Sequence, residues 1–171
     1  MVIWITGLSG AGKTTIAKAL VGEMRNRNLT VVSVDGDLVR EIVGDPQIKH
    51  DYQSRLTNAY RICRFAKALD AQNFWVVVST MSLFSEIHEW NRKNFIGYTE
   101  VLIQVDKEVL KNRNARNLYS SFEKGTMKDV VGFDLAAEEP KNPDLIIQNN
   151  IDHTDFNSHV NAILAFLNLR K

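Results

Sequence analysis

The residue types near the start of the chain could bind phosphate. Residues 7–14 read Gly-Leu-Ser-Gly-Ala-Gly-Lys-Thr, which fits the pattern G-x-x-x-x-G-K-[ST] of a P-loop. Glycines let backbone N–H groups approach an anion without a clash from Cβ, and a following helix adds partial positive charge at its N-terminus. In this pattern Lys13 reaches the β- and γ-phosphates, and the hydroxyl of Thr14 is a ligand of Mg²⁺. The motif predicts a site for a nucleoside triphosphate with magnesium.

The neighbours of this motif have the pattern that a P-loop needs. Residues 2–6, Val-Ile-Trp-Ile-Thr, read as a buried strand. Residues 14–27 read as a helix, because Ile16, Leu20 and Met24 recur at a spacing of four. The alternative is a glycine-rich turn that carries Lys and Thr without binding phosphate. The strand–loop–helix context argues against that alternative.

Two carboxylates follow the next predicted strand. A P-loop enzyme needs an acid near Mg²⁺ or near the attacking group, usually at the end of an apolar strand. Residues 74–78 form such a strand but end in Ser79, whereas Asp35 and Asp37 follow the strand predicted at residues 30–34. A carboxylate here could accept a proton from an acceptor hydroxyl or hold a metal-bound water. The alternative is a turn in which Asp37 only caps the next helix, and the residues alone leave both interpretations open.

Apolar strands alternate with amphipathic helices along the chain. This alternation predicts an α/β fold, a doubly wound parallel five-stranded sheet with helices on both faces. Ligands in such folds bind at the carboxyl ends of the strands, where the P-loop, residues 35–37 and residues 79–84 are all expected. The predicted strands are 2–6, 30–34, 74–78, 100–105 and 145–148, and the predicted helices are 14–27, 38–43, 54–72, 85–95, 107–114 and 155–169.

Length and composition set broad limits on the class of protein. The chain has 171 residues and a net charge of +1, which predicts one domain over residues 1–171 without a general attraction to nucleic acid or membrane. Its single Cys63 cannot form an internal disulfide and is expected to be a packed core thiol. No basic region precedes the strand at Val2, so no signal peptide is expected. We therefore expect a cytoplasmic enzyme with small-molecule partners.

One cationic segment is expected to move. Residues 107–128 contain six Lys or Arg residues, with Gly125 and few apolar side chains. This composition is typical of a mobile, cationic lid, which we place at about residues 112–131. The alternative is a pair of solvated surface helices.

Several motifs, in order along the chain, resemble those of the adenylyl-sulfate (APS) kinase family. Residues 7–17, GLSGAGKTTIA, are similar to the family's P-loop GLSGSGKSTIA, and residues 35–40, Asp-Gly-Asp-x-x-Arg, resemble its DGDxxR motif. Residues 54–67 are similar to its DRxxNIRR…VAK helix. The remaining similar segments are residues 81–84 in the place of ISP[FY], 113–119 in the place of RDxKGLY, Gly132 in the place of the FTG glycine, and 139–145 in the tail. This resemblance spans nearly the whole chain and implies the P-loop kinase fold.

The resemblance also implies a reaction, the transfer of a phosphoryl group from ATP with Mg²⁺ to the ribose 3′-hydroxyl of a nucleotide. Its catalytic residues would be Lys13, Asp35 and Asp37, with a carboxylate as the base, and which aspartate is the base stays open. The magnesium ligands would be Thr14 and Asp35. The implied ATP-binding residues are Gly7, Ser9, Gly10, Ala11, Gly12, Lys13, Thr14 and Thr15, with Arg113 and Arg116 closing over ATP from the lid.

For the acceptor, the resemblance implies that guanidinium groups hold its phosphate-containing part, because forked donors suit anionic oxygens. Arg40 and Arg55 would play this role together with Asn58. A homodimer is also expected on the resemblance alone. The acceptor-binding residues are expected to be Asp37, Arg40, Tyr52, Arg55, Asn58, Met81, Ser82, Leu83 and Val130.

The departures from the family pattern fall on the base pocket and the lid. Family members that use APS sandwich the adenine between two aromatic rings, one from a GFS-like segment and one from the Phe of FTG. This chain has residues 49–52, Lys-His-Asp-Tyr, in the first place and Val130 in the second. Leu83 replaces the proline of ISP[FY]. In the lid, Asn114, Arg116 and Asn117 replace the Asp, Lys and Gly of RDxKGLY. Because the donor part is retained, we expect the same reaction on another acceptor. We favour cytidine diphosphoramidate, the substrate of a capsule-pathway branch of the family, with APS as the alternative.

Other function classes fit the sequence less well. A GTPase switch would need a D-x-x-G motif after an apolar strand, whereas residues 129–132, Asp-Val-Val-Gly, lie in the predicted lid, and no N-K-x-D motif is present. A gluconate- or shikimate-type kinase would not need Arg55 and Asn58 beside the DGDxxR motif. A non-catalytic nucleotide-binding regulator would not need Lys13 and both aspartates, and measurable ATP turnover would exclude it.

Overall fold

The computed structural model describes residues 1–44, 51–150 and 156–169, with Arg116 described by its backbone alone. Its centre is a five-stranded sheet in the order β2-β3-β1-β4-β5, in which every pair of neighbouring strands is parallel. The predicted fold class is confirmed. The strands are β1 Val2–Thr6, β2 Val31–Asp35, β3 Trp75–Ser79, β4 Tyr98–Gln104 and β5 Leu145–Gln148.

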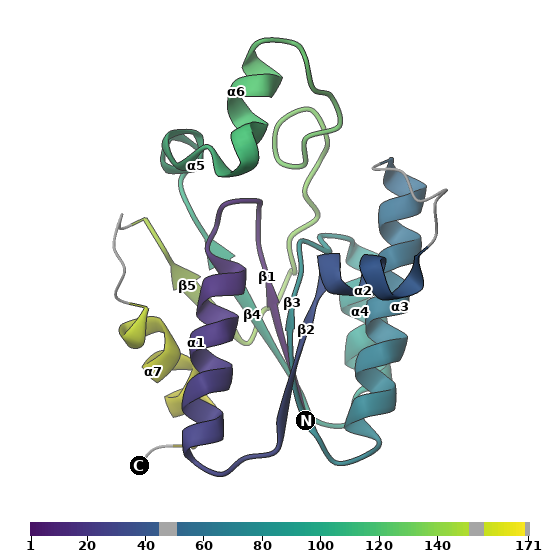
Figure 1. Ribbon diagram of the computed structural model, residues 1–171, viewed down its shortest axis with the longest axis vertical. Coiled ribbons are helices and arrows are strands. Elements are labelled where there is room, and N and C mark those ends of the chain that lie inside the picture. Colours follow the sequence, from purple (N-terminus) through teal and green to yellow (C-terminus); the bar gives the residue numbers. More distant parts are fainter. Residues whose placement is uncertain (45–50, 151–155, 170–171) are drawn as a thin grey trace.

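Helices cover both faces of this sheet (Figure 1). On one face lie α1 (Lys13–Asn26) and α7 (Asn157–Phe166), and on the other α3 (Tyr52–Asp70) and α4 (Ser85–Asn94). The short α2 (Gly36–Val43) follows β2 directly. Helices α5 (Lys107–Arg113) and α6 (Leu118–Glu123) stand beyond the carboxyl ends of the strands. The P-loop and the β2–α2 turn are at this same end of the sheet.

The strands are apolar because both of their faces are buried. In β1, Ile3 and Ile5 pack in a core cluster with α1 and α7, whereas Val2 and Trp4 pack in a second cluster with α3 and α4. Side chains of a strand alternate between the two faces of the sheet, so each strand supplies both clusters. The central strand therefore fixes the position of the P-loop, which begins where β1 ends.

The elements match the sequence predictions closely. The described bounds of all five strands, and of the helices up to residue 113, differ from the predicted bounds by two residues or fewer. The predicted lid contains structure that the sequence did not indicate separately, a 3₁₀ turn at Ala115–Asn117 followed by α6. This helix forms because Tyr119 and Phe122, three residues apart, both pack on Phe133.

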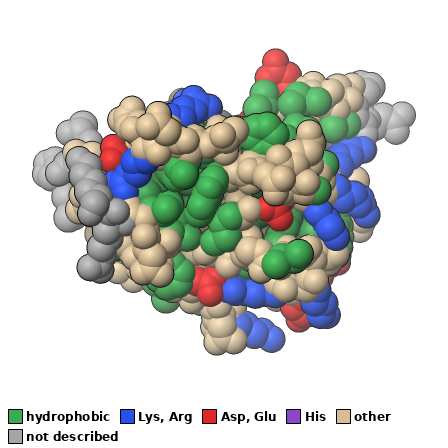
Figure 2. Space-filling model, turned by 90° about the horizontal axis from the view of Figure 1, so that it is seen from below, with side chains coloured by type: hydrophobic (Ala, Val, Ile, Leu, Met, Phe, Trp, Pro, Cys, Tyr) green, Lys and Arg blue, Asp and Glu red, His purple; other side chains and the backbone are tan. Residues whose placement is uncertain are grey.

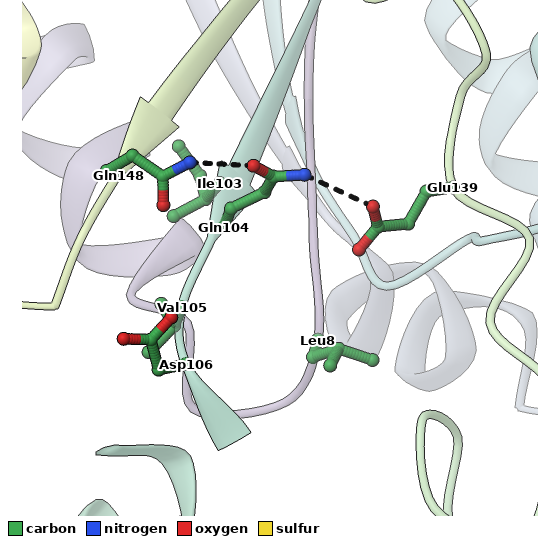
Figure 3. A pocket seen from close by; sticks show the side chains of 7 residues that line it. All are labelled: Leu8, Ile103, Gln104, Val105, Asp106, Glu139 and Gln148. Carbon is green, nitrogen blue, oxygen red and sulfur yellow. Dashed lines mark hydrogen bonds between the residues drawn. The ribbon is translucent and has the colours of Figure 1, made fainter. Parts of the chain in front are cut away.

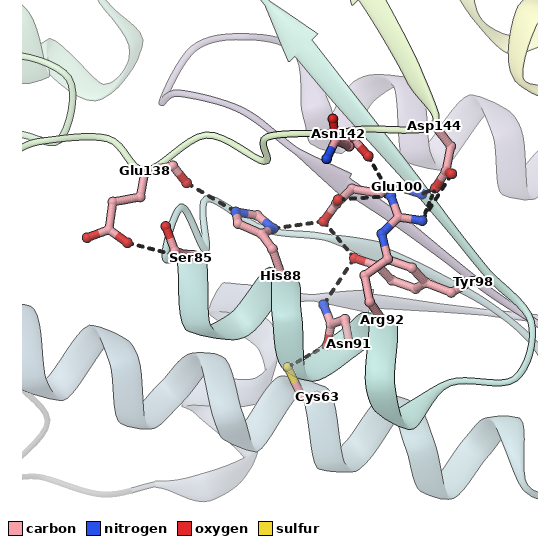
Figure 4. A network of polar contacts seen from close by, with 10 residues as sticks. All are labelled: Cys63, Ser85, His88, Asn91, Arg92, Tyr98, Glu100, Glu138, Asn142 and Asp144. Atoms are coloured by element: carbon pink, nitrogen blue, oxygen red, sulfur yellow. Dashed lines mark hydrogen bonds and ion pairs between the residues drawn. The ribbon is translucent and has the colours of Figure 1, made fainter.

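A buried polar network fixes the segment that leads from the lid back to the sheet (Figure 4). Glu100, in β4, has an exposed fraction of only 1%. Its carboxylate lies 2.7 Å from Nδ1 of His88 and 3.2 Å from Nη2 of Arg92. Arg92 also pairs with Asp144 at 2.8 Å, and Nε2 of His88 lies 3.2 Å from the carbonyl oxygen of Glu138. Residues 138–144 are thereby attached to α4 and β4.

The opposite end of the molecule, where the strands begin, is shown in Figure 2. Hydrophobic side chains lie there among both cationic and acidic ones, so neither sign of charge dominates this face. This mixture agrees with the net charge of +1. In the described part of the chain, the helices are too short or too polar to cross a membrane.

The buried Cys63 gives a prediction about chemical reactivity. Its thiol is fully buried and hydrogen-bonds Oδ1 of Asn91 at 3.1 Å, and burial raises its pKa to about 12. Because the thiolate is the reactive form, the native chain should resist a disulfide reagent such as DTNB at pH 8, and the chain in guanidinium chloride should release one equivalent of product. Rapid stoichiometric labelling of the native chain would contradict this placement.

Candidate active site

The P-loop has a backbone shape that requires its glycines. Gly10 and Gly12 have φ angles of 78° and 94°, in the left-handed region that side chains with Cβ rarely adopt. A Cβ on Gly12 would lie 2.7 Å from Nδ2 of Asn149, so the loop is also closely packed. Gly12 directly precedes α1, which places the first N–H groups of that helix at the end of the loop. This arrangement can bind a phosphate chain.

Four carbonyl oxygens of the P-loop, those of residues 8–11, accept hydrogen bonds from side chains. Lys13 donates from Nζ to the oxygen of Leu8 at 2.7 Å, and the hydroxyl of Tyr119 donates to that of Ser9 at 2.5 Å. Arg113 donates from Nη1 to the oxygen of Gly10 at 3.4 Å, and Asn149 donates from Nδ2 to that of Ala11 at 2.9 Å. Tyr119 and Asn149 were not predicted as site residues. Only the position of Tyr119 in the segment similar to RDxKGLY could have indicated it.

The carboxylate of Asp35 lies at the junction of three elements. Oδ2 accepts hydrogen bonds from the hydroxyl of Thr14 at 3.1 Å and from that of Ser79 at 2.9 Å, while Oδ1 accepts from the backbone N–H of Asp37 at 2.9 Å. Asp35 and Ser79 are partners in the β2–β3 register, which explains why an acid on β2 can stand beside the serine that ends β3. The acid that the sequence lacks after β3 is therefore supplied by the neighbouring strand.

The structure also corrects one interpretation of the second aspartate. Asp35, not Asp37, is the N-cap of α2, because its side chain accepts the hydrogen bond from the backbone N–H of Asp37. Asp37 lies in the first turn of the helix with an exposed side chain. The alternative in which Asp37 only caps the helix is thus wrong.

The residues at this junction fit a magnesium ion. The Thr14 hydroxyl oxygen and Oδ2 of Asp35 are hard oxygen donors 3.1 Å apart. Adjacent ligands of octahedral Mg²⁺, at about 2.1 Å from the metal, are separated by about 3 Å. The two side chains also stand at the N-terminus of α1, beside the loop that would bind the phosphates. Thr14 and Asp35 are thus suited to hold the ion that the motif predicts.

Two guanidinium groups stand on the α2–α3 side of the site. Arg55, in α3, is half-buried and donates from Nη2 to the backbone oxygen of Asp129 at 2.9 Å. Burial lowers the pKa of Arg55, and the positive charge of Arg40 lowers it further. Acidic residues around Arg55, among them Asp129, act in the opposite direction. Two guanidinium groups on this side of the site are suited to an anionic substrate group.

Asn58 connects α3 to the turn after β2. Its Nδ2 donates to the carbonyl oxygen of Gly36 at 3.4 Å, and the residue is only 3% exposed. Its Oδ1 is buried and has no hydrogen-bond partner among the described residues. Asn58 therefore holds the turn that carries Asp35 and Asp37 in place beside the helix that carries Arg55.

The other predicted acceptor residues differ in exposure. Leu83 and Val130 are buried, at 3% and 2% exposed, and Ser82 is bonded through its hydroxyl to Thr80 at 2.9 Å. Tyr52 is 48% exposed, with its ring packed edge-on against Phe84 at a centroid distance of 5.1 Å. Of this group, Tyr52 offers an aromatic surface to solvent. Residues 49 and 50, which stand in the place of the family's GFS-like segment, lie outside the described residues. Met81 is partly exposed in the same loop as Ser82.

The loop after the lid joins the two halves of the site. Arg55 binds the oxygen of Asp129 from one side, and on the other side a Cβ on Gly132 would lie 2.7 Å from the side chain of Leu8 in the P-loop. Within the loop, the carboxylate of Asp134 accepts from the backbone N–H groups of Asp129 and Val130, at 2.9 and 2.5 Å. Residues 129–134 thus span the distance between the P-loop and the cationic pair.

The base of the predicted lid is attached to the P-loop. Arg113 donates from Nη2 to the backbone oxygen of Asn149 at 2.8 Å, in addition to its bond to Gly10. A Cβ on Gly10 would lie 3.2 Å from that of Ala115, so the lid packs directly on the loop. The side chain of Arg116 lies outside the described part of the chain. Movement of residues 112–131 stays a prediction.

A polar hollow of about 240 Å³ lies beside Leu8, between the ends of β4 and β5 and residue Glu139 (Figure 3). Its lining includes a hydrogen-bonded row in which Gln148 donates to Gln104 at 2.7 Å and Gln104 donates to Glu139 at 3.3 Å. Asp106, the N-cap of α5, completes the polar part of the lining. None of these residues was predicted from the sequence, and the side chains of the predicted acceptor residues lie elsewhere.

The position of Asp35 leads to a prediction about the metal. Asp35→Asn keeps the cap oxygen for α2 but removes the negative charge beside Thr14. The dissociation constant for MgATP should therefore rise at least about tenfold. The dissociation constant for ATP measured in EDTA, without the metal, should rise less. Calorimetric titration measures both constants. The matched control is Asp70→Asn, which alters an ion pair with the N-terminus at the far end of α3. Equal MgATP binding by Asp35→Asn and the native chain would exclude the assigned role.

Comparison with known proteins places this geometry in a family. A family model described as adenylylsulphate kinase matches residues 1–148. The chain is 38% identical over 149 residues to the cytidine diphosphoramidate kinase of Campylobacter jejuni, covering 87% of this chain and 86% of that protein. It is 33% identical over 149 residues to a probable adenylyl-sulfate kinase of Archaeoglobus fulgidus, covering 87% and 96% of the two chains.

A solved structure has the same fold. The adenylyl-sulfate kinase of Mycobacterium tuberculosis, solved in complex with AMPPNP and APS, superposes with a TM-score of 0.88. It covers 98% of this chain and 96% of its own, at 24% identity. The family model spans most of the chain, and both relatives exceed 30% identity over most of its length. The chain therefore belongs to the adenylyl-sulfate kinase family and is a phosphotransferase.

Proposed function

We propose that this protein transfers the γ-phosphate of MgATP to the ribose 3′-hydroxyl of a nucleotide, and that the acceptor is cytidine diphosphoramidate. The observation that carries the proposal is the β2–α2 turn. Asp35 hydrogen-bonds the P-loop Thr14, and two residues later Asp37 presents an exposed carboxylate. The donor site and the candidate catalytic base are thereby connected through two residues of the β2–α2 turn.

The donor site binds ATP through the P-loop. The N–H groups of the loop and of the start of α1 face the phosphate oxygens, and Lys13 leaves the oxygen of Leu8 to contact the β- and γ-phosphates. Thr14 and Asp35 would hold Mg²⁺, which would supply positive charge to the phosphate oxygens. The protein contributes position and electrostatic stabilisation, which are the main requirements of phosphoryl transfer.

The acceptor is activated at Asp37. The 3′-hydroxyl gives its proton to the carboxylate of Asp37, its oxygen forms a bond to the γ-phosphorus, and the bond from that phosphorus to the β,γ-bridging oxygen breaks to release ADP. Asp35 is less suited to be the base because its oxygens already accept three hydrogen bonds. Asp37 is therefore the base or the group that orients the hydroxyl.

The acceptor's anionic group is held by Arg40 and Arg55. Their mutual repulsion, which contributes to the lowered pKa of Arg55, is relieved when an anion binds between them. Because Asn58 fixes the β2–α2 turn to α3, the cations and Asp37 keep a constant relation to each other. The hydroxyl of a nucleotide bound at one end by the cations would then be presented to the base.

The identity of the acceptor's nucleobase is inferred from the acceptor pocket. Val130 is buried and aliphatic where family members that use APS have a stacking ring, which favours a smaller pyrimidine. The relative from C. jejuni, 38% identical, is named a cytidine diphosphoramidate kinase. If the acceptor is this nucleotide, the resemblance to the capsule-pathway branch implies a role in capsule polysaccharide biosynthesis. APS is the second candidate, because Tyr52 and Phe84 provide an aromatic pair and several relatives are named adenylyl-sulfate kinases. A cytoplasmic location remains a prediction. The homodimer is also still a prediction, which sedimentation equilibrium can test.

Competition between the two acceptors tests the substrate. With MgATP and equal concentrations of cytidine diphosphoramidate and APS, the phosphorylated cytidine nucleotide should exceed the phosphorylated APS by at least about tenfold, because an aromatic wall for adenine is missing. Ion-exchange chromatography of the products measures the ratio. A preference for APS would overturn the cytidine assignment and retain the family reaction. ATP binding without turnover of either acceptor would favour a non-catalytic regulator.

The role of Asp37 as the catalytic base is tested by Asp37→Asn. This substitution preserves the shape of the side chain and removes the proton acceptor. We expect kcat to fall by about 10²- to 10⁴-fold with little change in the affinity for ATP. The control is Glu41→Gln, an equally exposed acid one turn further along α2. Steady-state kinetics of both variants distinguish the roles, and an unchanged kcat in Asp37→Asn would remove Asp37 from the mechanism.

A further inference from the structure

We infer that Tyr119, Arg113 and Asn149 are positioning residues of the donor site. Tyr119 and Asn149 hold two P-loop carbonyl groups so that the N–H groups of Gly10 and Gly12 face the phosphates, and Arg113 fixes the turn between these two peptide groups. This inference rests on the proposed use of ATP. It adds two residues, Tyr119 and Asn149, that contact the loop from behind. It also gives Arg113 a role different from closing over ATP.

The geometry of the peptide bond connects these contacts to phosphate binding. The peptide group is planar and trans, so the C=O of one residue and the N–H of the next point in opposite directions. Tyr119 fixes the oxygen of Ser9 and thereby the N–H of Gly10, and Asn149 fixes the oxygen of Ala11 and thereby the N–H of Gly12. Both N–H groups are directed away from the side on which the lid base and the end of β5 lie.

Arg113 orients the intermediate peptide group. Its bond to the oxygen of Gly10 holds the plane whose N–H, on Ala11, closes a turn to the oxygen of Leu8 at 3.2 Å. The second guanidinium nitrogen binds the backbone oxygen of Asn149 at 2.8 Å. Arg113 thus ties the loop to the end of β5, with both of these nitrogens directed at backbone oxygens behind the loop.

The supporting side chains are themselves rigid. The ring of Tyr119 is 1% exposed and packs on Phe133 at a centroid distance of 4.9 Å. Asn149 is 3% exposed, its backbone N–H donates to the oxygen of Gln104 at 2.9 Å, and its Oδ1 lies 3.3 Å from Nε2 of His159. Because these residues are fixed by the core, the loop can be organised before ATP arrives. Preorganised donors stabilise charge without a reorganisation cost during the reaction.

The glycines explain why such external support is needed. Gly10 and Gly12 can adopt several backbone conformations at little cost, and only some of them direct N–H groups at an anion. A side-chain hydrogen bond to the carbonyl on each peptide group selects one of these conformations. Removing a bond should therefore increase the freedom of the loop and weaken its grip on phosphate, while the acceptor side is unaffected.

The test is Tyr119→Phe, which removes one hydroxyl and retains the packed ring. We expect the dissociation constant for ATP, measured by calorimetry, to rise about tenfold, because a buried carbonyl loses its partner. The inhibition constant of inorganic tripolyphosphate should rise by the same factor, since the effect acts on the phosphates. The KM for the acceptor should stay within about twofold. Asn149→Asp, which removes the other donor, should weaken ATP binding at least as much.

The matched control is Tyr60→Phe, which removes a hydroxyl that donates to Glu86 at 2.9 Å on the other face of the sheet and should leave ATP binding unchanged. Unaltered ATP and tripolyphosphate binding by Tyr119→Phe would overturn the inference. So would equal losses of ATP and acceptor affinity with a lowered Tm, which would indicate general destabilisation. Failure of the native chain to bind ATP would instead overturn the proposed function.

Discussion

The interaction on which the site depends most is the contact of the Asp35 carboxylate with Thr14, Ser79 and the backbone of Asp37. It joins the P-loop, the end of β3 and the start of α2 at one negative charge. The sheet order makes this contact possible, because β3 lies between β2 and β1 and brings both strand ends to one edge. The same charge caps a helix, orients the threonine and stands where Mg²⁺ is expected.

The two core clusters support different parts of the site. The cluster under α1 and α7 includes Tyr119 and Val130, so it supports the donor loop and the return from the lid. The cluster under α3 and α4 carries the helix that presents Arg55 and Asn58. Residues 129–134 connect the two sides through Arg55 and Leu8. The P-loop and the helix with Arg55 thus rest on different hydrophobic clusters, and residues 129–134, which include Val130 of the first cluster, connect them.

Much of this arrangement could be predicted from the sequence, because it follows from local patterns. The apolar strands, the glycine-rich motif and the acids after β2 all lie within short stretches of chain. Tyr119 and Asn149 could not be found in this way, since they contact the P-loop from more than 100 residues away. The sequence left open whether Asp37 only caps α2, whereas the cap is Asp35, which has the same side chain. Only backbone geometry distinguishes them.

The most direct test of the central claim is ³¹P NMR of the product formed from MgATP and the cytidine nucleotide. A resonance coupled to the ribose 3′-proton, together with one equivalent of ADP, would agree with phosphoryl transfer at the β2–α2 turn. Phosphate release without a phosphorylated nucleotide, or transfer to another position of the acceptor, would contradict the assignment of this site.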